Sequence, residues 1–316
     1  MAISNTVAQI LINGVQQGAI FALLGIGLTI ILGTMDFLNL AHGALYLVGA
    51  YTGLLVFRTT ELSGGVLYDN GFTVVGFDGG FITAIVVVPI IGIIVGVAME
   101  RYVAEPFYDR PETDQLLVTF GLALVVQEVI KQLMSGATFQ PTAPSTILGV
   151  NVSGTVSLPL VGAYSEWRLW IIAIVLSIIG ITYFIIERTD FGLVVQAGTV
   201  DSEMVRLLGI KITRSYSIVF ALGAALAALA GFIGITFQTV SPQIGTERAL
   251  IPAFLTIVVG GAGNVVGAIA GGIILGITVS AMSVIASQWA SIVLYGVAAV
   301  VLLVRPEGIL GSTGVN

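Results

Sequence analysis

The sequence predicts an all-α, polytopic integral membrane protein with about eight or nine transmembrane helices, some of them broken or half-length. Of the 316 residues, 57% are hydrophobic and only 9% are charged, whereas a soluble domain carries about 25% charged residues. Uncharged apolar windows of about 18 residues or more recur along the chain, and each is long enough to cross a bilayer. These windows do not alternate between apolar and polar residues, which excludes a transmembrane β-barrel.

The first apolar segment predicts two crossings rather than one. Between residues 7 and 57 the only ionisable side chains apart from tyrosine are Asp36 and His42. One helix over this segment would be about 75 Å long, since an α-helix rises about 1.5 Å per residue, and the hydrocarbon core is only about 30 Å thick. The segment must therefore turn, and the sequence GTMD at residues 33–36 is the expected turn.

Seven further apolar segments follow and give about nine crossings in a single membrane domain that covers residues 1–316. The segment 250–262 is short for a full crossing and contains Pro252, so a broken or half-length helix is expected there. The seven expected segments are 81–101, 115–134, 167–186, 215–236, 250–262, 264–286 and 288–304.

Basic residues in short loops predict the orientation, because they concentrate on the cytoplasmic side. Both 101–114 and 187–214 are basic and should be cytoplasmic. The N-terminus is then outside, the C-terminus is inside near Arg305, and the loops 58–80 and 136–166 are outside. The second outer loop alternates enough to suggest a small hairpin. The basic residues of the two cytoplasmic segments are Arg101, Arg110, Arg188, Arg206, Lys211 and Arg214.

The chain lacks the residues that several classes of protein would need for their function. The chain has no cysteine and one histidine, so disulfides, a thiolate nucleophile and a metal site are not expected. It contains no G-x-x-x-x-G-K-[ST], G-x-S-x-G or H-E-x-x-H sequence. We therefore expect neither an enzyme nor a cofactor, and any ATP hydrolysis must come from partner subunits. Nucleic acid is not an expected partner.

The charge balance suggests a high-salt environment. The net charge is −6, and only two lysines accompany nine arginines. Acidic surfaces keep proteins soluble through their charge rather than through their fold, so we treat adaptation to salt as a hypothesis. Activity that is highest at low salt would contradict it.

The only histidine lies in FLNLAHGALY, residues 37–46, directly after the expected turn. Asn39 and His42 are three residues apart and hence neighbours on one helix face. Either side chain could bond a backbone group freed at the turn, which would give the pair a structural or gating role. Direct contact with a substrate is the alternative. Asn39, His42 and Gly43 are therefore candidates for a helix break or for the lining of a translocation path.

A glycine-rich segment, GGAGNVVGAIAGG at residues 260–272, is a second candidate break. Several of its glycines are four residues apart, a spacing that lets membrane helices approach closely. Tight helix packing is one interpretation. The other is that Gly260, Gly261, Gly263 and Asn264 unwind and line the path, since freed backbone groups must face water or protein.

Glu128 and Lys131 lie three residues apart near the outer end of the segment 115–134. A neutralised pair that reaches toward the interface is one interpretation, and a substrate contact is the other. Unchanged uptake by both Glu128→Gln and Lys131→Met would make the pair structural.

The sequence DSEMVRLLG predicts a short helix inside the loop 187–214. Acidic residues cap and favour its start, and a glycine suits its end. A helix of about eight residues is unstable alone in water, so its apolar face must pack on the chain's own helices or on a cytoplasmic partner. The residues are Asp201 at the cap, Glu203 in the first turn, Met204, Val205 and Leu208 on the apolar face, and Gly209 at the end.

The chain resembles the branched-chain amino-acid ABC transporter permease family, in its LivH branch. Glu203 and Gly209 have the spacing of the EAA loop, the coupling element of ABC-importer permeases. Gln127 matches a glutamine common in the family. The resemblance covers nearly the whole chain in order, through NLAHGALYLVGAY, RTDFGLVVQAGTVDSEMVRLLGI, GGAGNVVGAIAGGIILG and RPEGILG.

The chain also departs from the family pattern. Leu193 and Gln196 stand where the family usually has arginine, so the loop is less basic here. Leu40 replaces the usual aromatic residue, and Asn264 replaces the usual serine. Two bulkier apolar residues replace the two alanines of the loop motif and still supply an apolar docking surface.

The resemblance implies a non-catalytic permease subunit of an ATP-binding-cassette importer in the cell membrane. Its partners would be a second related permease, two ATPase subunits and an extracytoplasmic substrate-binding protein. The path would lie between the two permeases, and the helix at 201–209 would transmit ATPase closure to the membrane helices. Branched-chain or related hydrophobic amino acids are the expected cargo. A permease for urea or short amides and an ion-coupled secondary transporter are the alternatives, the last needing intramembrane coupling sites.

Overall fold

The computed structural model describes residues 2–140, 142–200, 202–207 and 212–311. Within them, seven helices, some extended by short helical turns, are long and apolar enough to cross a membrane. Two shorter apolar helices are α2 (His42–Phe57) and α10 (Ile251–Gly260). The long helices are α1 (Ala2–Met35), α4 (Gly80–Met99), α5 (Glu112–Met134), α6 (Glu166–Arg188), α9 (Ile212–Gly234), α11 (Val265–Ile285) and α12 (Ala290–Val304).

These nine helices correspond one for one to the nine expected segments and confirm the all-α membrane fold. The turn expected at residues 33–36 begins later, because α1 continues through Met35. Thr34 stays helical and its hydroxyl donates to the carbonyl oxygen of Ile30 at 2.7 Å. α10 is as short as expected, and Pro252 lies in its first turn, shortly after a π-helical turn, Gly245–Leu250.

α1 and α9 form the centre of the bundle. The most apolar window of α1 is 89% buried and that of α9 is 72% buried, but those of α5 and α12 are only 11% buried. α1 packs against α11 and α9, and α9 also packs against α2 and α4. α5 and α12 therefore present most of their surface outward.

Small residues let the central helices approach closely. A Cβ on Gly49 of α2 would lie 2.1 Å from the carbonyl oxygen of Ala228 in α9. A Cβ on Gly18 of α1 would lie 2.7 Å from the Cα of Ile273 in α11. Both distances are shorter than a van der Waals contact, so these two helix pairs require glycine at the crossing.

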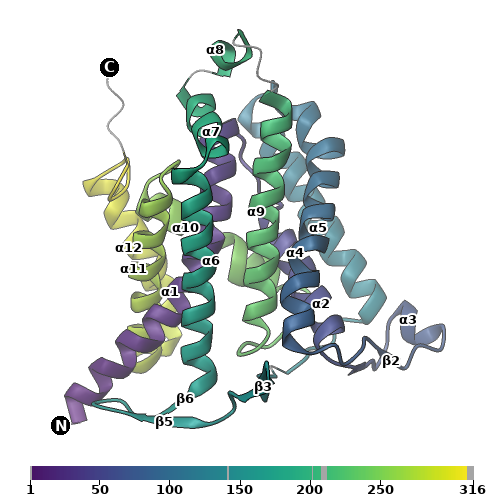
Figure 1. Ribbon diagram of the computed structural model, residues 1–316, viewed down its shortest axis with the longest axis vertical. Coiled ribbons are helices and arrows are strands. Elements are labelled where there is room, and N and C mark those ends of the chain that lie inside the picture. The colour runs from purple at the N-terminus through teal and green to yellow at the C-terminus, as the bar shows by residue number, and fades with distance from the viewer. Residues whose placement is uncertain (1, 141, 201, 208–211, 312–316) are drawn as a thin grey trace.

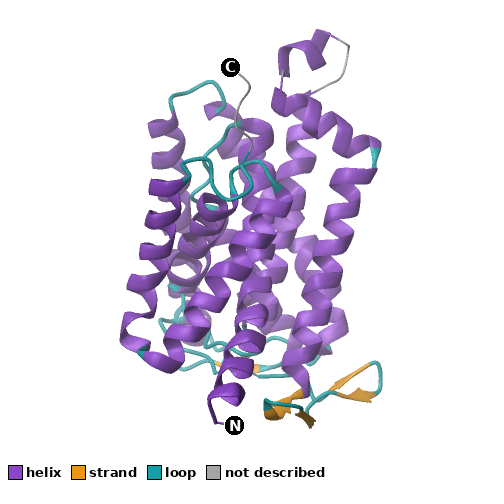
Figure 2. Cartoon of the chain, turned by 90° about the vertical axis from the view of Figure 1, so that its left-hand side faces the viewer, coloured by secondary structure: helices purple, strands orange, loops and turns teal. Residues whose placement is uncertain are grey.

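The N-terminus and the described strands lie at one end of the bundle, at the bottom of Figures 1 and 2. A single helical turn, α3 (Val66–Asp69), accompanies the first strand pair. The loop 136–166 contains two hairpins where one was expected. The antiparallel pairs are β1 (Thr60–Glu61) with β2 (Val74–Val75), β3 (Thr146–Ile147) with β4 (Val150–Asn151), and β5 (Thr155–Leu158) with β6 (Gly162–Ser165).

The opposite end carries the other long connections. α4 is followed there by a π-helical turn, Glu100–Ala104, and a 3-10 turn, Glu105–Phe107. α7 (Asp190–Val200) and α8 (Ser202–Leu207) connect α6 to α9, and α8 projects beyond the bundle (Figure 1). The 3-10 turn that joins α11 to α12, Ser287–Trp289, lies instead at the N-terminal end, since Ser280 of α11 bonds the carbonyl oxygen of Ile10 in α1.

Candidate functional site

The first break, defined as residues 36–41, connects α1 to α2 inside the bundle. α1 ends where Asp36 adopts a positive φ of 48°. Phe37, Asn39 and Ala41 are fully buried, with 0% exposure. Irregular backbone that is buried in this way must find its hydrogen-bond partners within the protein, since lipid offers none.

Side chains of α5 supply two of these partners. The backbone N–H of Leu38 donates to Oε1 of Gln115 at 3.2 Å, and that of Leu40 donates to Oγ1 of Thr119 at 3.1 Å. Sequence analysis did not single out Gln115 or Thr119. The signal that could have found them is their spacing of four residues, which places two polar side chains on one face near the start of an apolar helix.

Asn39 and His42 bond different groups. Oδ1 of Asn39 accepts the N–H of Ala41 at 3.0 Å and so closes the turn before α2. His42 is fully buried, and its Nε2 lies 3.2 Å from the carbonyl oxygen of Leu24 in α1, so Nε2 carries the proton and donates. Gly27 leaves room for the ring, because a Cβ there would lie 3.1 Å from Cε1 of His42. The histidine therefore holds α2 against α1 instead of capping the turn.

Asn39 and His42 each keep one buried polar atom unpaired. Within the described residues, Nδ2 of Asn39 and Nδ1 of His42 have no hydrogen-bond partner. The first is a donor, and the second is an acceptor when Nε2 carries the proton. Unsatisfied groups of this kind are rare in protein interiors. Asn39 and His42 therefore remain candidates for a functional role, and four other buried side chains, Gln16, Thr29, Tyr51 and Thr60, share this property.

Gly43 and Gln127 both contact the segment that leads into α10. A Cβ on Gly43 would lie 2.3 Å from the carbonyl oxygen of Gly245, the first residue of a π-helical turn, Gly245–Leu250. Thr246 in the same turn donates to Oε1 of Gln127 at 3.3 Å. The start of α2, α5 and this turn therefore meet, although they are far apart in the sequence.

The second break, defined as residues 261–264, separates α10 from α11. Gly261 and Gly263 have positive φ angles of 107° and 75°, which glycine adopts without strain. Asn264 caps α11, since its Oδ1 accepts the N–H of Gly267 at 2.9 Å. Its Nδ2 donates to a carbonyl oxygen of the segment after α12 at 2.8 Å. The break is thus tied to both α11 and the C-terminal segment.

The glycine-rich segment is tightly packed in one part and forms the wall of a cavity in another. A Cβ on Gly260 would lie 2.1 Å from the carbonyl oxygen of Gly267, so α10 and α11 pack tightly. Gly263 and Asn264 instead line a cavity of about 280 Å³. Polar side chains face the break across this cavity, from Thr29 and Thr34 of α1, Glu187 of α6 and Gln196 of α7.

The two breaks share an apolar cavity and not the polar one. The lining of the 280 Å³ cavity includes neither Asn39 nor His42. A second cavity of about 430 Å³ touches the first break at Leu38 and the second break at Ala262. Its other walls come mainly from apolar side chains of α10 and from the segment after α12, with one leucine each from α1 and α12. The expected path residues therefore form two neighbouring sites instead of one.

α7 is anchored to the end of α6. A Cβ on Gly192 would overlap the carbonyl oxygen of Ile186, at 1.8 Å, so only glycine lets α7 fold back there. Nε2 of Gln196 donates to the same oxygen at 3.2 Å, and Val195 is buried. α8 thus projects from a fixed base.

α8 lies where the short coupling helix was expected, over Ser202–Leu207. Three of the candidate coupling residues, Asp201, Leu208 and Gly209, lie outside the described residues. The side chain of Glu203 lies outside them as well.

The apolar face of α8 differs from the expected one. Met204 is 53% exposed and Val205 is 3% exposed, because consecutive helical residues point about 100° apart. Leu207, three residues after Met204, is 76% exposed. The exposed apolar pair is therefore Met204 and Leu207, and their spacing of three residues is visible in the sequence.

Glu128 and Lys131 form an ion pair on the surface of α5. Their charged groups are 3.1 Å apart, with side-chain exposures of 51% and 44%. Gln132 also donates to Oε1 of Glu128 at 2.9 Å. This geometry favours the structural interpretation of the pair.

Comparison with known proteins gives a consistent result. The family described as branched-chain amino acid transport system / permease component matches residues 10–303. The high-affinity branched-chain amino acid transport system permease protein LivH of Escherichia coli (strain K12) is 30% identical, over 98% of this chain and 96% of LivH. Its counterpart BraD of Pseudomonas aeruginosa is 30% identical, over 98% and 97%. A probable LivH of Methanocaldococcus jannaschii is 26% identical, over 96% and 92%. No solved structure gave a significant match.

The matched range includes both breaks and the segment α7–α8. Proteins of this family are non-catalytic permease subunits of ABC importers, and separate subunits hydrolyse ATP. With its seven long apolar helices, the chain is a multi-pass protein of the cell membrane. It belongs to the family of permease components of branched-chain amino acid transport systems.

Proposed function

We propose that this permease moves branched-chain or related hydrophobic amino acids inward by alternating access. The names of the relatives support the cargo. One observation carries the coupling to ATPase subunits: α8 projects beyond the bundle and exposes Met204 and Leu207 (Figure 1). A short helix that presents an apolar pair in this way is suited to binding in a groove of a partner protein.

The proposed assembly contains a second related permease, two ATPase subunits and an extracytoplasmic substrate-binding protein. This chain contributes a single permease domain over 1–316, and the path runs between the two permeases. The residues proposed for the path or its helix breaks are Asn39, His42, Gly43, Gln127, Gly260, Gly261, Gly263 and Asn264. Those proposed for coupling are Asp201, Glu203, Met204, Val205, Leu208 and Gly209.

In the proposed orientation, the α8 end is cytoplasmic, and the N-terminus and the hairpins are outside. Seven of the eleven lysines and arginines fall in the connections at the α8 end, and such residues concentrate on the cytoplasmic side. The loop 187–214 is then cytoplasmic, and the loops 58–80 and 136–166 are external. The seven residues are Arg101, Arg110, Arg188, Arg206, Lys211, Arg214 and Arg305.

Aspartate at the exposed positions of α8 tests the coupling. Met204→Asp and Leu207→Asp should abolish co-purification of the ATPase and ATP-driven uptake, while the permease stays in the membrane at normal amounts. Leu148→Asp is the matched control, because Leu148 is an 83% exposed leucine at the opposite end of the bundle. Glu203→Arg should act like the α8 variants. Normal uptake by those variants would refute the proposal.

Uptake by the reconstituted complex tests the cargo. The complete complex with its binding protein, in proteoliposomes with internal ATP, should take up labelled leucine, and valine should compete with it. ATP-driven uptake of urea or acetamide without leucine uptake would assign the alternative cargo. Leucine uptake driven by an ion gradient in the absence of ATP would point to a secondary transporter.

A further inference from the structure

Glu100 is a buried carboxyl group that the proposed function does not use. It begins the π-helical turn at the end of α4 and has 0% exposure. Burying a carboxyl group is costly unless its oxygens are bonded. π-helical turns are rare, and they frequently occur at functional sites. The burial of a carboxyl group at this position therefore needs a physical explanation.

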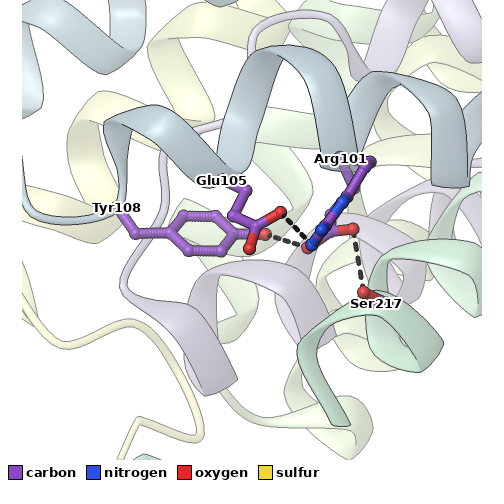
Figure 3. Close-up of polar contacts among 5 residues, drawn as sticks. Arg101, Glu105, Tyr108 and Ser217 are labelled. Atoms are coloured by element: carbon purple, nitrogen blue, oxygen red, sulfur yellow. Dashed lines mark hydrogen bonds and ion pairs between the residues drawn. The ribbon is translucent and has the colours of Figure 1, made fainter. Parts of the chain in front are cut away.

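Both carboxyl oxygens of Glu100 accept a hydroxyl (Figure 3). The hydroxyl of Tyr108 donates to Oε1 at 2.8 Å, and that of Ser217 donates to Oε2 at 2.8 Å. The neighbouring Arg101 pairs with Glu105 at 2.7 Å. Among the described residues, no basic side chain lies within ion-pair distance of Glu100, so the two hydroxyls are what stabilise it.

The two hydroxyls come from segments with different neighbours. Ser217 lies in the second turn of α9, the next described helix along the chain after α8. Tyr108 lies in the connection between α4 and α5. Burial, followed by the hydrogen bond to Glu100, raises the pKa of Tyr108, so its hydroxyl stays protonated and remains a donor.

The ring of Tyr108 continues the connection to the first break. It packs edge-on against Phe37 with centroids 5.5 Å apart, and against Tyr216 with centroids 5.7 Å apart. Phe37 is a fully buried residue of the first break. A continuous series of contacts thus runs from α9 through Ser217, Glu100 and Tyr108 to the first break.

We propose that Glu100 is a positioning residue for transport, which transmits movement of the α7–α8 segment through Tyr108 to the first break. The proposal rests on the proposed coupling of α8 to the ATPases. A displacement of the start of α9 moves Ser217, and the two hydrogen bonds on one carboxyl make Tyr108 follow. Spatial continuity is not itself coupling, so the test must measure coupling directly.

The first measurement is the number of leucine molecules transported per ATP hydrolysed by the reconstituted complex. Tyr108→Phe removes one hydroxyl and keeps the ring contacts, and Ser217→Ala removes the other hydroxyl. Each should lower this ratio by about fivefold or more, the lower end of typical coupling effects, while complex assembly and ATPase activity persist. The double variant should be no worse than either single one, because the two bonds act in series and every variant keeps the direct contact between the rings of Tyr216 and Tyr108. Ser217→Thr keeps a hydroxyl and should retain the ratio.

Arg101→Gln is the matched control. It breaks an exposed ion pair on the residue next to Glu100 and should leave the ratio unchanged. An unchanged ratio in both Tyr108→Phe and Ser217→Ala would overturn the proposal. So would a loss of uptake that merely follows a loss of assembled complex, because that result would show a purely structural role.

A second measurement does not depend on the cargo. The chain has no cysteine, so a Leu40→Cys variant carries a single thiol in the first break. In the otherwise unchanged complex, ATP should alter the rate at which this thiol reacts, and Tyr108→Phe or Ser217→Ala should abolish that response. An ATP response without leucine uptake would refute only the proposed cargo. A response that persists in both variants would refute the role of Glu100.

Discussion

The two helix breaks solve the same problem in opposite ways. Both interrupt membrane helices with a sequence that contains an asparagine, and both free backbone groups that lipid cannot satisfy. The first break is buried, and side chains of α5 bond its N–H groups. The second break uses positive-φ glycines and an asparagine cap, and it lines a polar cavity. An interruption that contains asparagine therefore forms a mostly packed joint in one place, which borders only the apolar cavity at Leu38, and the wall of the polar cavity in the other.

The difference separates two properties that a translocation path needs. A packed joint such as the first break moves only with its neighbours, because every shift disturbs close contacts. A break that borders a cavity can admit water or solute without such a shift. We therefore expect the first break to respond to distant movements and the second break to be accessible in the resting state.

Accessibility to a thiol reagent gives the largest expected contrast between the breaks. In this cysteine-free chain, Ala262→Cys should react readily with a water-soluble reagent applied from the α8 side, because Ala262 lines both cavities. Ala41→Cys should stay unreactive, since Ala41 has 0% exposure. Comparable labelling rates in the assembled complex would show that the breaks do not differ in this way.

Replacing one glycine near each break with alanine should give the next largest contrast, in the stability of the two variants. At Gly43, the second residue of α2 after the first break, a Cβ would lie 2.3 Å from a carbonyl oxygen, whereas at Gly263 the nearest atom would be 3.6 Å away. Gly43→Ala should destabilise by about 2–3 kcal/mol through overpacking. Gly263→Ala should cost only about 1 kcal/mol, from its positive φ. Thermal unfolding of the two purified variants measures both losses of stability. An equal shift in Tm would contradict the expected difference between the two positions.

Removing the polar support of the first break should cost about 1–3 kcal/mol, since it leaves a buried N–H without a partner. Thr119→Val keeps the shape of the side chain but removes the hydroxyl that accepts from Leu40. Thr278→Val is the matched control, because the hydroxyl of Thr278 bonds only its own helix, at the carbonyl of Ile274, and is exposed. If both variants unfold at the same temperature, α5 does not support the break.

Sequence reasoning located the helices well because length alone constrains them: a run of 51 residues cannot cross a 30 Å core once. It placed the end of α1 too early, because three of the four residues of the expected turn are helical and the chain turns only at Asp36, which has a positive φ. It identified Asn39 and His42 from their residue types but could not identify Gln115, Thr119 or Glu100. Their partners lie in other segments of the chain, and only the packed structure brings those groups together.

The smallest expected effect lies at the second break and tests whether its cap matters. Asn264→Ala removes the acceptor for the N–H of Gly267 and the donor to the carbonyl of Leu310, and should cost about 1 kcal/mol, as is typical for loss of an N-cap. Asn264→Ser restores the cap but not the bond to Leu310, so it should recover most of that stability. Thermal unfolding distinguishes the two contributions. If the serine variant is as unstable as the alanine variant, the bond to the C-terminal segment, and not the helix cap, is what holds the second break in place.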